Sequence, residues 1–313
     1  MNTAHEQSEA SAASALASSG GDTVRAYEDA ATAIGRLDAT AQLAEPGFRE
    51  LLVLRCIATG AGISHQGMIA LAVADGEGGQ ASAAGGQFAG ALRQGAARAR
   101  GGALPSVESL HELLQLAPPA PSVQAIDDLL RDAHERTPPV LKAALVAQAL
   151  RAPSSRDADG PARRSLTDEQ LAALAVTLVL CVGGATTDAW LTLPKVTGVR
   201  TDLSLRELFT ALAREARAAE RALLTARDLA DVDEHRVRDT LGRAAYSALD
   251  VLAFVRERIV ISVPQASRAL GLTAPTAGAA VARLVELGIL REATGKARSR
   301  VFAYDGIVRS LSP

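Results

Sequence analysis

Three cationic side chains near the end of this sequence lie close together, at a spacing suited to binding phosphate groups. Lys296, Arg298 and Arg300 alternate with small residues over five positions. Residues 262–313 contain seven lysine or arginine residues and three acidic ones, a net charge of +4, whereas the whole chain carries −2 and its remainder therefore −6. A basic segment on an acidic chain is typical of an electrostatic contact with nucleic acid.

The same segment carries the start and stop signals of two short helices. Gly271 suits the end of the first helix because glycine tolerates a left-handed backbone. Thr273 is a good N-cap for the second helix, and Pro275 falls in its first turn, where a missing N–H costs nothing. Apolar residues then recur at helical spacing, at Ala277, Val281, Leu284 and Leu287.

Two runs that favour β-structure, residues 289–293 and 300–304, follow the second helix and are joined by six residues of turn type. Helix, turn, helix and two-stranded hairpin is the order of a winged helix-turn-helix. The outward face of its second helix would be Pro275, Ala279, Ala282 and Glu286, with Thr276 and Arg283 at the flanks. The candidate DNA contacts are Thr273, Thr276, Arg283, Lys296, Arg298 and Arg300. A winged helix that contacts protein instead is the alternative.

The composition favours closely packed helices in the rest of the chain. Of 313 residues, 48% are apolar but only 3% are aromatic, so the core must be built from alanine, leucine and valine. We expect a mainly α fold: a disordered N-terminus over 1–22, a helical body over 23–230, and a linking helix with the winged module over 231–313. Helices are predicted from residue 23 and over 48–58, 88–100, 105–116, 122–133, 140–150, 166–182, 205–226 and 234–258, with a flexible Gly-rich loop at 74–87.

Cysteine usage and hydropathy give an expectation for the compartment. Cys56 and Cys181 lie far apart without metal-ligand spacing, which predicts buried packing residues in a reducing compartment. The longest apolar run, about 171–184, is shorter than the ~20 residues that span a bilayer, and the N-terminus has no secretory pattern. We expect a soluble, cytoplasmic protein without a metal or another cofactor.

Several stretches together resemble one known family. They are Ala-Ile-Gly-Arg-Leu-Asp at 33–38, Leu-Pro-Ser-Val-Glu-Ser-Leu-His-Glu-Leu-Leu at 104–114, the proline-rich bend at 117–121, the segment 138–145, and the ending 288–304. In this order they resemble Fic-family proteins that have a C-terminal winged helix. The resemblance implies a Fic-like helical body, and it places the catalytic loop at residues 151–164.

That loop lacks the residues that Fic chemistry requires. Fic enzymes carry the motif H-P-F-x-D-G-N-G-R-x-x-R, in which the histidine is the general base. Here no histidine is present in 151–164. Ser154 or Ser155 stands in its place, and a serine cannot act as a base near neutral pH. Asp159, Gly160, Arg163 and Arg164 resemble remnants of the motif, so we expect a vestigial nucleotide-binding loop and no catalytic residue.

Histidines elsewhere give weaker indications. Ser64 and His65 stand where the family carries an inhibitory motif, whose glutamate is missing, and adjacent residues seldom face each other as a hydrolase pair. His134, beside Asp132 and Glu135, fits a solvated helix face better than a metal site, which would need a third ligand.

The sequence therefore predicts a DNA-binding, regulatory protein that forms a homodimer. Its Fic-like body would act as scaffold, sensor or dimerisation module. A nucleotidyltransferase with residual nucleotide binding and a protein-interaction adaptor are the alternatives.

Overall fold

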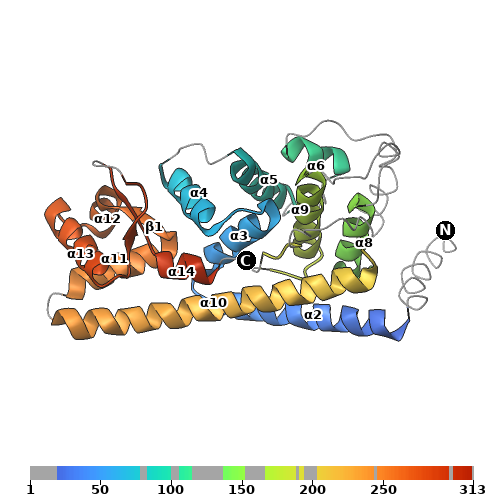
Figure 1. The fold of residues 1–313 in the computed structure, drawn as a ribbon, viewed down its shortest axis with the longest axis horizontal. Helices are drawn as coiled ribbons and strands as arrows, with labels where there is room; N and C mark the ends of the chain where they lie inside the picture. Colours follow the sequence, from blue (N-terminus) through green and yellow to red (C-terminus); the bar gives the residue numbers. More distant parts are fainter. Residues whose placement is uncertain are drawn as a thin grey trace. The chain divides into compact units, whose positions relative to one another are not determined.

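The computed structural model describes residues 20–77, 83–99, 106–114, 137–151, 166–187, 190–193, 203–242, 245–295 and 299–311. The fold is mainly helical with one small three-stranded sheet (Figure 1). Its helices are α2 (Gly21–Gln42), α3 (Pro46–Ala61), α4 (His65–Glu77), α5 (Ala83–Ala99), α6 (Val107–Leu113), α8 (Pro139–Arg151), α9 (Leu166–Val182), α10 (Leu205–Leu241), α11 (Ala245–Arg258), α12 (Val263–Leu270), α13 (Ala274–Glu286) and α14 (Asp305–Ser310). Its strands are β1 (Val260–Ser262), β2 (Arg291–Glu292) and β3 (Val301–Ala303).

The chain divides into two compact units. The first comprises Met1–Gln42, Thr59–Gly62 and Gln87–Ala218, and the second comprises Leu43–Ala58, Ile63–Gly86 and Ala219–Pro313. The second unit thus contains most of α3 and all of α4 in addition to the C-terminal module. These are stretches that the sequence assigned to the helical body.

In the first unit, α9 is the central helix. It packs against α8 and α6, and every residue from Leu171 to Leu180 is buried. This confirms the expectation of a buried core helix for the long apolar run. Small residues allow close packing around it, since a Cβ at Gly95 would lie 2.9 Å from Leu178. The many small side chains of this chain therefore let its helices pack closely together.

In the second unit, the sheet has the strand order β1-β3-β2, and both pairs are antiparallel. Val260 lies opposite Ala303, and Arg291 lies opposite Ala303 on the other side of β3. Helix α13 packs against α11 and α12, while α4 packs against β1 and α14. The sequence predicted β2 and β3 as longer runs, and it predicted neither β1 nor α14.

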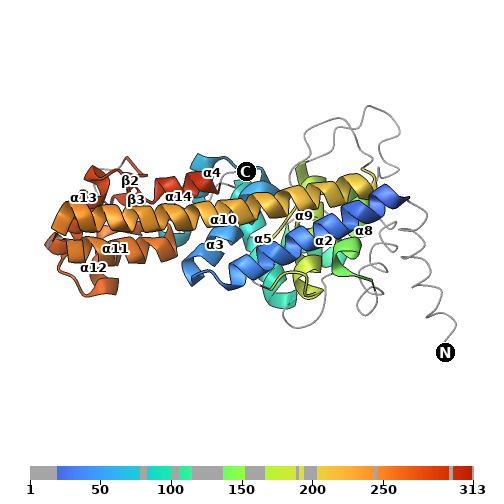
Figure 2. The ribbon, with the colours of Figure 1, turned by 90° about the horizontal axis from the view of Figure 1, so that it is seen from below.

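The long helix α10 corrects the prediction of two helices over 205–226 and 234–258. It is one helix of 37 residues, and Figure 2 shows its unbroken course. The stretch between the two predicted helices contains no glycine or proline that would end a helix. The break comes instead after Leu241, at Gly242, whose φ of +52° is a left-handed value that glycine adopts without strain.

Three other expectations need adjustment. Helix α2 begins at Gly21, inside the segment predicted to be disordered, whose residues 1–19 lie outside the described ranges. The predicted loop at 74–87 is helical at both ends, because α4 continues to Glu77 and α5 begins at Ala83. Cys56 is buried, but Cys181 is partly exposed, with its Sγ 3.4 Å from Thr186 Oγ1.

Among the described residues, no helix combines the length and the apolar character that crossing a bilayer requires.

Candidate nucleic-acid interface

The helix-capping residues around α12 and α13 fix the turn between these two helices. At the start of α12, Ser262 and Gln265 form a capping box in which each side chain accepts a hydrogen bond from the other residue's backbone N–H. Gly271 ends α12 with a left-handed φ of +64°. The Ser267 hydroxyl then donates to Leu272 O at 2.7 Å, and Thr273 caps α13. The predicted roles of Gly271, Thr273 and Pro275 are confirmed.

Helix α13 has one buried face and one exposed face. Of the predicted stripe, Ala277, Val281 and Leu284 are buried, together with Ala280, whereas Leu287 is half-buried at the C-cap. The exposed residues of the helix are Ala274, Pro275, Thr276, Ala279, Ala282, Val285 and Glu286. The outward face is therefore made almost entirely of small or apolar side chains.

The polar candidates on α13 are partly engaged within the fold. Thr273 and Thr276 are exposed, and their hydroxyl oxygens lie 2.8 Å apart. Thr273 Oγ1 also accepts a hydrogen bond from Thr276 N at 3.3 Å. Arg283 is half-buried in the last turn, about 10 Å along the helix from Thr276. The three residues thus lie on one helix, but they do not form one cluster.

The hairpin that contains the cationic run is paired at its base. Ala293 N donates to Val301 O at 2.8 Å, and Val301 N donates to Thr294 Oγ1 at 3.3 Å. Gly295 and Ser299 both have positive φ values, +61° and +55°. Arg300 is exposed, with its Nε 3.9 Å from Glu292 Oε2. Lys296 and Arg298 lie outside the described residues.

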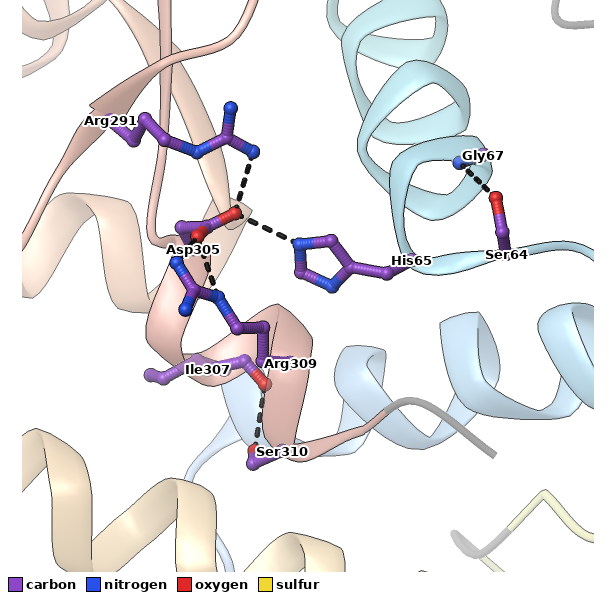
Figure 3. A network of polar contacts seen from close by, with 8 residues as sticks. All are labelled: Ser64, His65, Gly67, Arg291, Asp305, Ile307, Arg309 and Ser310. Carbon is purple, nitrogen blue, oxygen red and sulfur yellow. Dashed lines mark hydrogen bonds and ion pairs between the residues drawn. The ribbon is translucent and has the colours of Figure 1, made fainter.

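A buried carboxylate that the sequence did not single out lies next to this hairpin (Figure 3). Asp305 Oδ1 accepts hydrogen bonds from Arg291 Nη2 at 2.7 Å and from His65 Nε2 at 2.9 Å, while Oδ2 accepts from Arg309 Nε at 2.8 Å. We call these four residues the Asp305 cluster. It joins β2, α4 and the first and last turns of α14, so it fixes the base of the hairpin to α4.

These hydrogen-bond donors keep the Asp305 carboxylate ionised. Burial by itself would raise its pKa, but the hydrogen bonds from Arg291, Arg309 and His65 outweigh this effect and hold the pKa well below its usual range. Because an ionised carboxylate can only accept, the His65 nitrogen that faces it carries a proton. The charges of Arg291 and Arg309 are therefore partly neutralised within the module.

His65 has no nucleophilic partner in Ser64. Figure 3 shows the His65 ring turned toward Asp305 and the Ser64 hydroxyl turned toward Gly67. Ser64 Oγ accepts a hydrogen bond from Gly67 N at 3.3 Å, as a helix-capping residue does. The pair therefore lacks the geometry of a hydrolase site.

Two further buried contacts hold the module in the second unit. Arg55 Nη1 of α3 donates to Leu311 O at 2.7 Å, and the Tyr304 hydroxyl donates to Asp233 Oδ2 of α10 at 2.7 Å. Burial and the hydrogen bond to Asp233 raise the pKa of Tyr304 above its ordinary value. The end of the chain is thus attached to α3, α4 and α10.

The predicted nucleotide-binding loop falls outside the described residues, and with it Ser154, Ser155, Asp159, Gly160, Arg163 and Arg164. The helix that leads into this loop, α8, has two buried cationic residues that the sequence did not single out. Lys142 is 4% exposed, and burial lowers its pKa to about 8. Arg151 is 3% exposed at the last position of the helix. Both residues have interaction partners within the fold.

The described part of the chain contains no group of three or more histidine, cysteine or acidic residues placed to hold a metal ion. His134 lies outside that part. His235 donates from Nδ1 to Asp231 O at 2.7 Å on an exposed face of α10.

No sequence pattern indicates the Asp305 cluster, because His65 and Asp305 are 240 positions apart. A scan against protein-family models gave no match, and a search of curated proteins found no similar sequence.

Proposed function

We propose that this protein is a DNA-binding regulator whose C-terminal module, residues 245–311, docks on duplex DNA as a winged helix-turn-helix. The observation that carries the proposal is the element order α11, β1, α12, α13, β2, β3 with the sheet order β1-β3-β2. This order corresponds to the winged arrangement, in which the second helix of the pair enters the major groove and the hairpin lies beside it.

The charge distribution supports a phosphate-binding surface. The segment 262–313 carries +4 on a chain of net −2, and the run from Lys296 to Arg300 falls in the sequence between β2 and β3. Arg268 on α12 is also exposed. Phosphate contacts of this kind supply most of the affinity of non-specific DNA binding.

The exposed N-terminal turn of α13 supports the same orientation. In helix-turn-helix proteins, residues at the start of the recognition helix are the ones that approach the bases. Here Ala274, Pro275 and Thr276 are all exposed, whereas the opposite face of the helix is buried against α11 and α12.

For the remaining helices we propose a scaffold and dimerisation role on a degenerate Fic-like fold. Leu224 and Val232 on α10 are 42% and 62% exposed, which provides apolar surface for a second copy of the chain. The Asp305 cluster links α4 to β2 through the Asp305 carboxylate, which His65 and Arg291 share. A movement of α4 would therefore be transmitted to the hairpin through these hydrogen bonds.

The test is binding of a fluorescent 30-base-pair duplex, measured by anisotropy at about 50 mM salt, where phosphate contacts are strong. We expect saturable binding that weakens at least tenfold when Lys296, Arg298 and Arg300 are all replaced by alanine.

The matched control replaces Arg214, Arg221 and Arg227, three exposed arginines of α10, by alanine. It changes the net charge by the same amount but leaves the hairpin intact, so its affinity should stay within about threefold of the wild type. If neither the wild type nor the control bound the duplex, or if both triple variants lost affinity equally, the proposal would be wrong.

A further inference from the structure

The exposed face of α13 lacks the side chains with which proteins recognise bases. Direct recognition in the major groove uses bidentate arginine or lysine on guanine and asparagine or glutamine on adenine. None of these types occurs among the exposed residues of α13, which are three alanines, a proline, a threonine, a valine and a glutamate.

The few polar groups of the helix are unsuited to this task. The hydroxyls of Thr273 and Thr276 face each other at 2.8 Å, and Thr273 Oγ1 also serves as the N-cap acceptor. Glu286 is at the C-terminal end of α13, away from the turn that approaches the bases in helix-turn-helix complexes. Arg283 is half-buried in the same last turn and has a partner within the fold.

The exposed cationic side chains of the module are carried by the elements that precede and follow α13 in the chain rather than by its outward face. Arg268 is exposed on the preceding helix, and Arg300 is exposed on the hairpin that follows. Cations that flank a face of small side chains match the charge pattern of a duplex, in which phosphates border a groove.

Building on the proposed function, we infer that the module binds duplex DNA without direct recognition of base sequence. The flanking arginines contact the two phosphate backbones, and α13 occupies the major groove as a slender spacer. Its alanine and proline side chains let the helix backbone approach the groove floor, which longer side chains would prevent. The ligand class is therefore B-form duplex DNA of any sequence.

The first experiment measures binding to several 30-base-pair duplexes of unrelated sequence and matched base composition, under identical salt. Affinities should agree within about tenfold, whereas proteins that read bases directly separate their sites from other DNA by about 10³-fold or more. A duplex preferred by 10³-fold would overturn this inference but leave the proposed function intact. Failure to bind any duplex would overturn both.

A second arm uses duplex RNA of the same sequences. The A-form major groove is too narrow for a helix, so docking of α13 predicts at least tenfold weaker binding than to DNA. Equal affinity for both duplexes would show that α13 does not enter a groove.

Substitutions on the outward face test the role of α13 itself. Ala279→Glu places a negative charge in the groove and should weaken binding at least tenfold on every duplex, while Ala279→Gln, a neutral side chain of the same length, should weaken it less. The control is Ala253→Glu, at an exposed alanine of α11, which should change affinity less than threefold. Equal effects of Ala279→Glu and Ala253→Glu on affinity, or no effect of either Ala279 variant, would contradict docking through α13.

Discussion

At the scale of single residues, Asp305 is the group on which the attachment of the hairpin depends most. Its side chain is only 6% exposed and accepts hydrogen bonds from three cationic or potentially cationic residues. A buried carboxylate in such a setting stabilises the fold most while it is ionised, because protonation removes the negative charge that strengthens each of these hydrogen bonds and turns one oxygen into a donor.

Asp305→Asn should therefore destabilise the protein. Each hydrogen bond to a charged group contributes ~1.5–3 kcal/mol, so we expect a loss of about 2–4 kcal/mol in the free energy of unfolding by urea. Asp228→Asn, at an exposed position of α10, is the control and should stay within ~0.5 kcal/mol. Equal stability of the two variants would show that the Asp305 cluster does not contribute.

The same carboxylate predicts a pH dependence. Its pKa in the folded protein is depressed, so its contribution is complete above the unfolded value of ~3.9 and is lost as pH falls below it. The wild type should lose stability more steeply than Asp305→Asn between about pH 4 and pH 2 in urea titrations. Parallel curves for the two proteins would contradict the assignment.

The grouping of these four residues could not be predicted from the sequence. Arg309 and Asp305 are a local pair, but His65 and Arg291 join them only through the packing of α4 and β2. The nucleotide-loop residues 154–164 remain a prediction, as do Lys296 and Arg298.

At the scale of elements, the turn between α12 and α13 was the most predictable part of the fold. Its signals are local: Gly271 supplies a left-handed residue, Thr273 a side-chain acceptor, and Pro275 a fixed φ. The neighbouring junction was not predictable, because the chain passes from α11 to β1 through Ile259, which has a φ of +66°. A β-branched residue rarely adopts that conformation, and the surrounding packing holds it together with two backbone hydrogen bonds, from Ile259 N to Val255 O and from Tyr304 N to Ile259 O.

Replacing Gly271 and Gly278 by alanine should change the stability of the protein in opposite directions. Gly271→Ala forces a Cβ into a left-handed conformation and should cost ~1 kcal/mol. Gly278 lies inside α13, where a Cβ would meet Val263 Cγ1 at 3.9 Å, an ordinary contact, so Gly278→Ala should stabilise by ~0.5–1 kcal/mol. Thermal unfolding of both variants checks this, and shifts of the same sign would contradict the described caps.

At the scale of the whole molecule, composition predicted a mainly helical fold but not how it is divided. The alanine-rich helices leave no local mark of where one compact unit ends. Helix α10 runs without a break through residues of both units, and α3 and α4 belong with the C-terminal module although they come early in the chain. Such long-range grouping depends on packing, which a periodic pattern in one segment does not encode.

The unequal distribution of charge is the whole-molecule property on which the proposed function depends. The C-terminal segment is basic while the rest of the chain is acidic, so long-range repulsion from the body opposes DNA binding and the hairpin must provide the attraction. Affinity should therefore respond strongly to ionic strength.

The most direct test is the slope of log affinity against log salt concentration for a 30-base-pair duplex. Each neutralised phosphate contributes ~0.9 to that slope, so replacing Lys296, Arg298 and Arg300 by alanine should reduce its magnitude by about 2–3, while the Arg214, Arg221 and Arg227 triple variant should keep the wild-type slope. Equal slopes for the wild type and the hairpin variant would contradict DNA binding through this module.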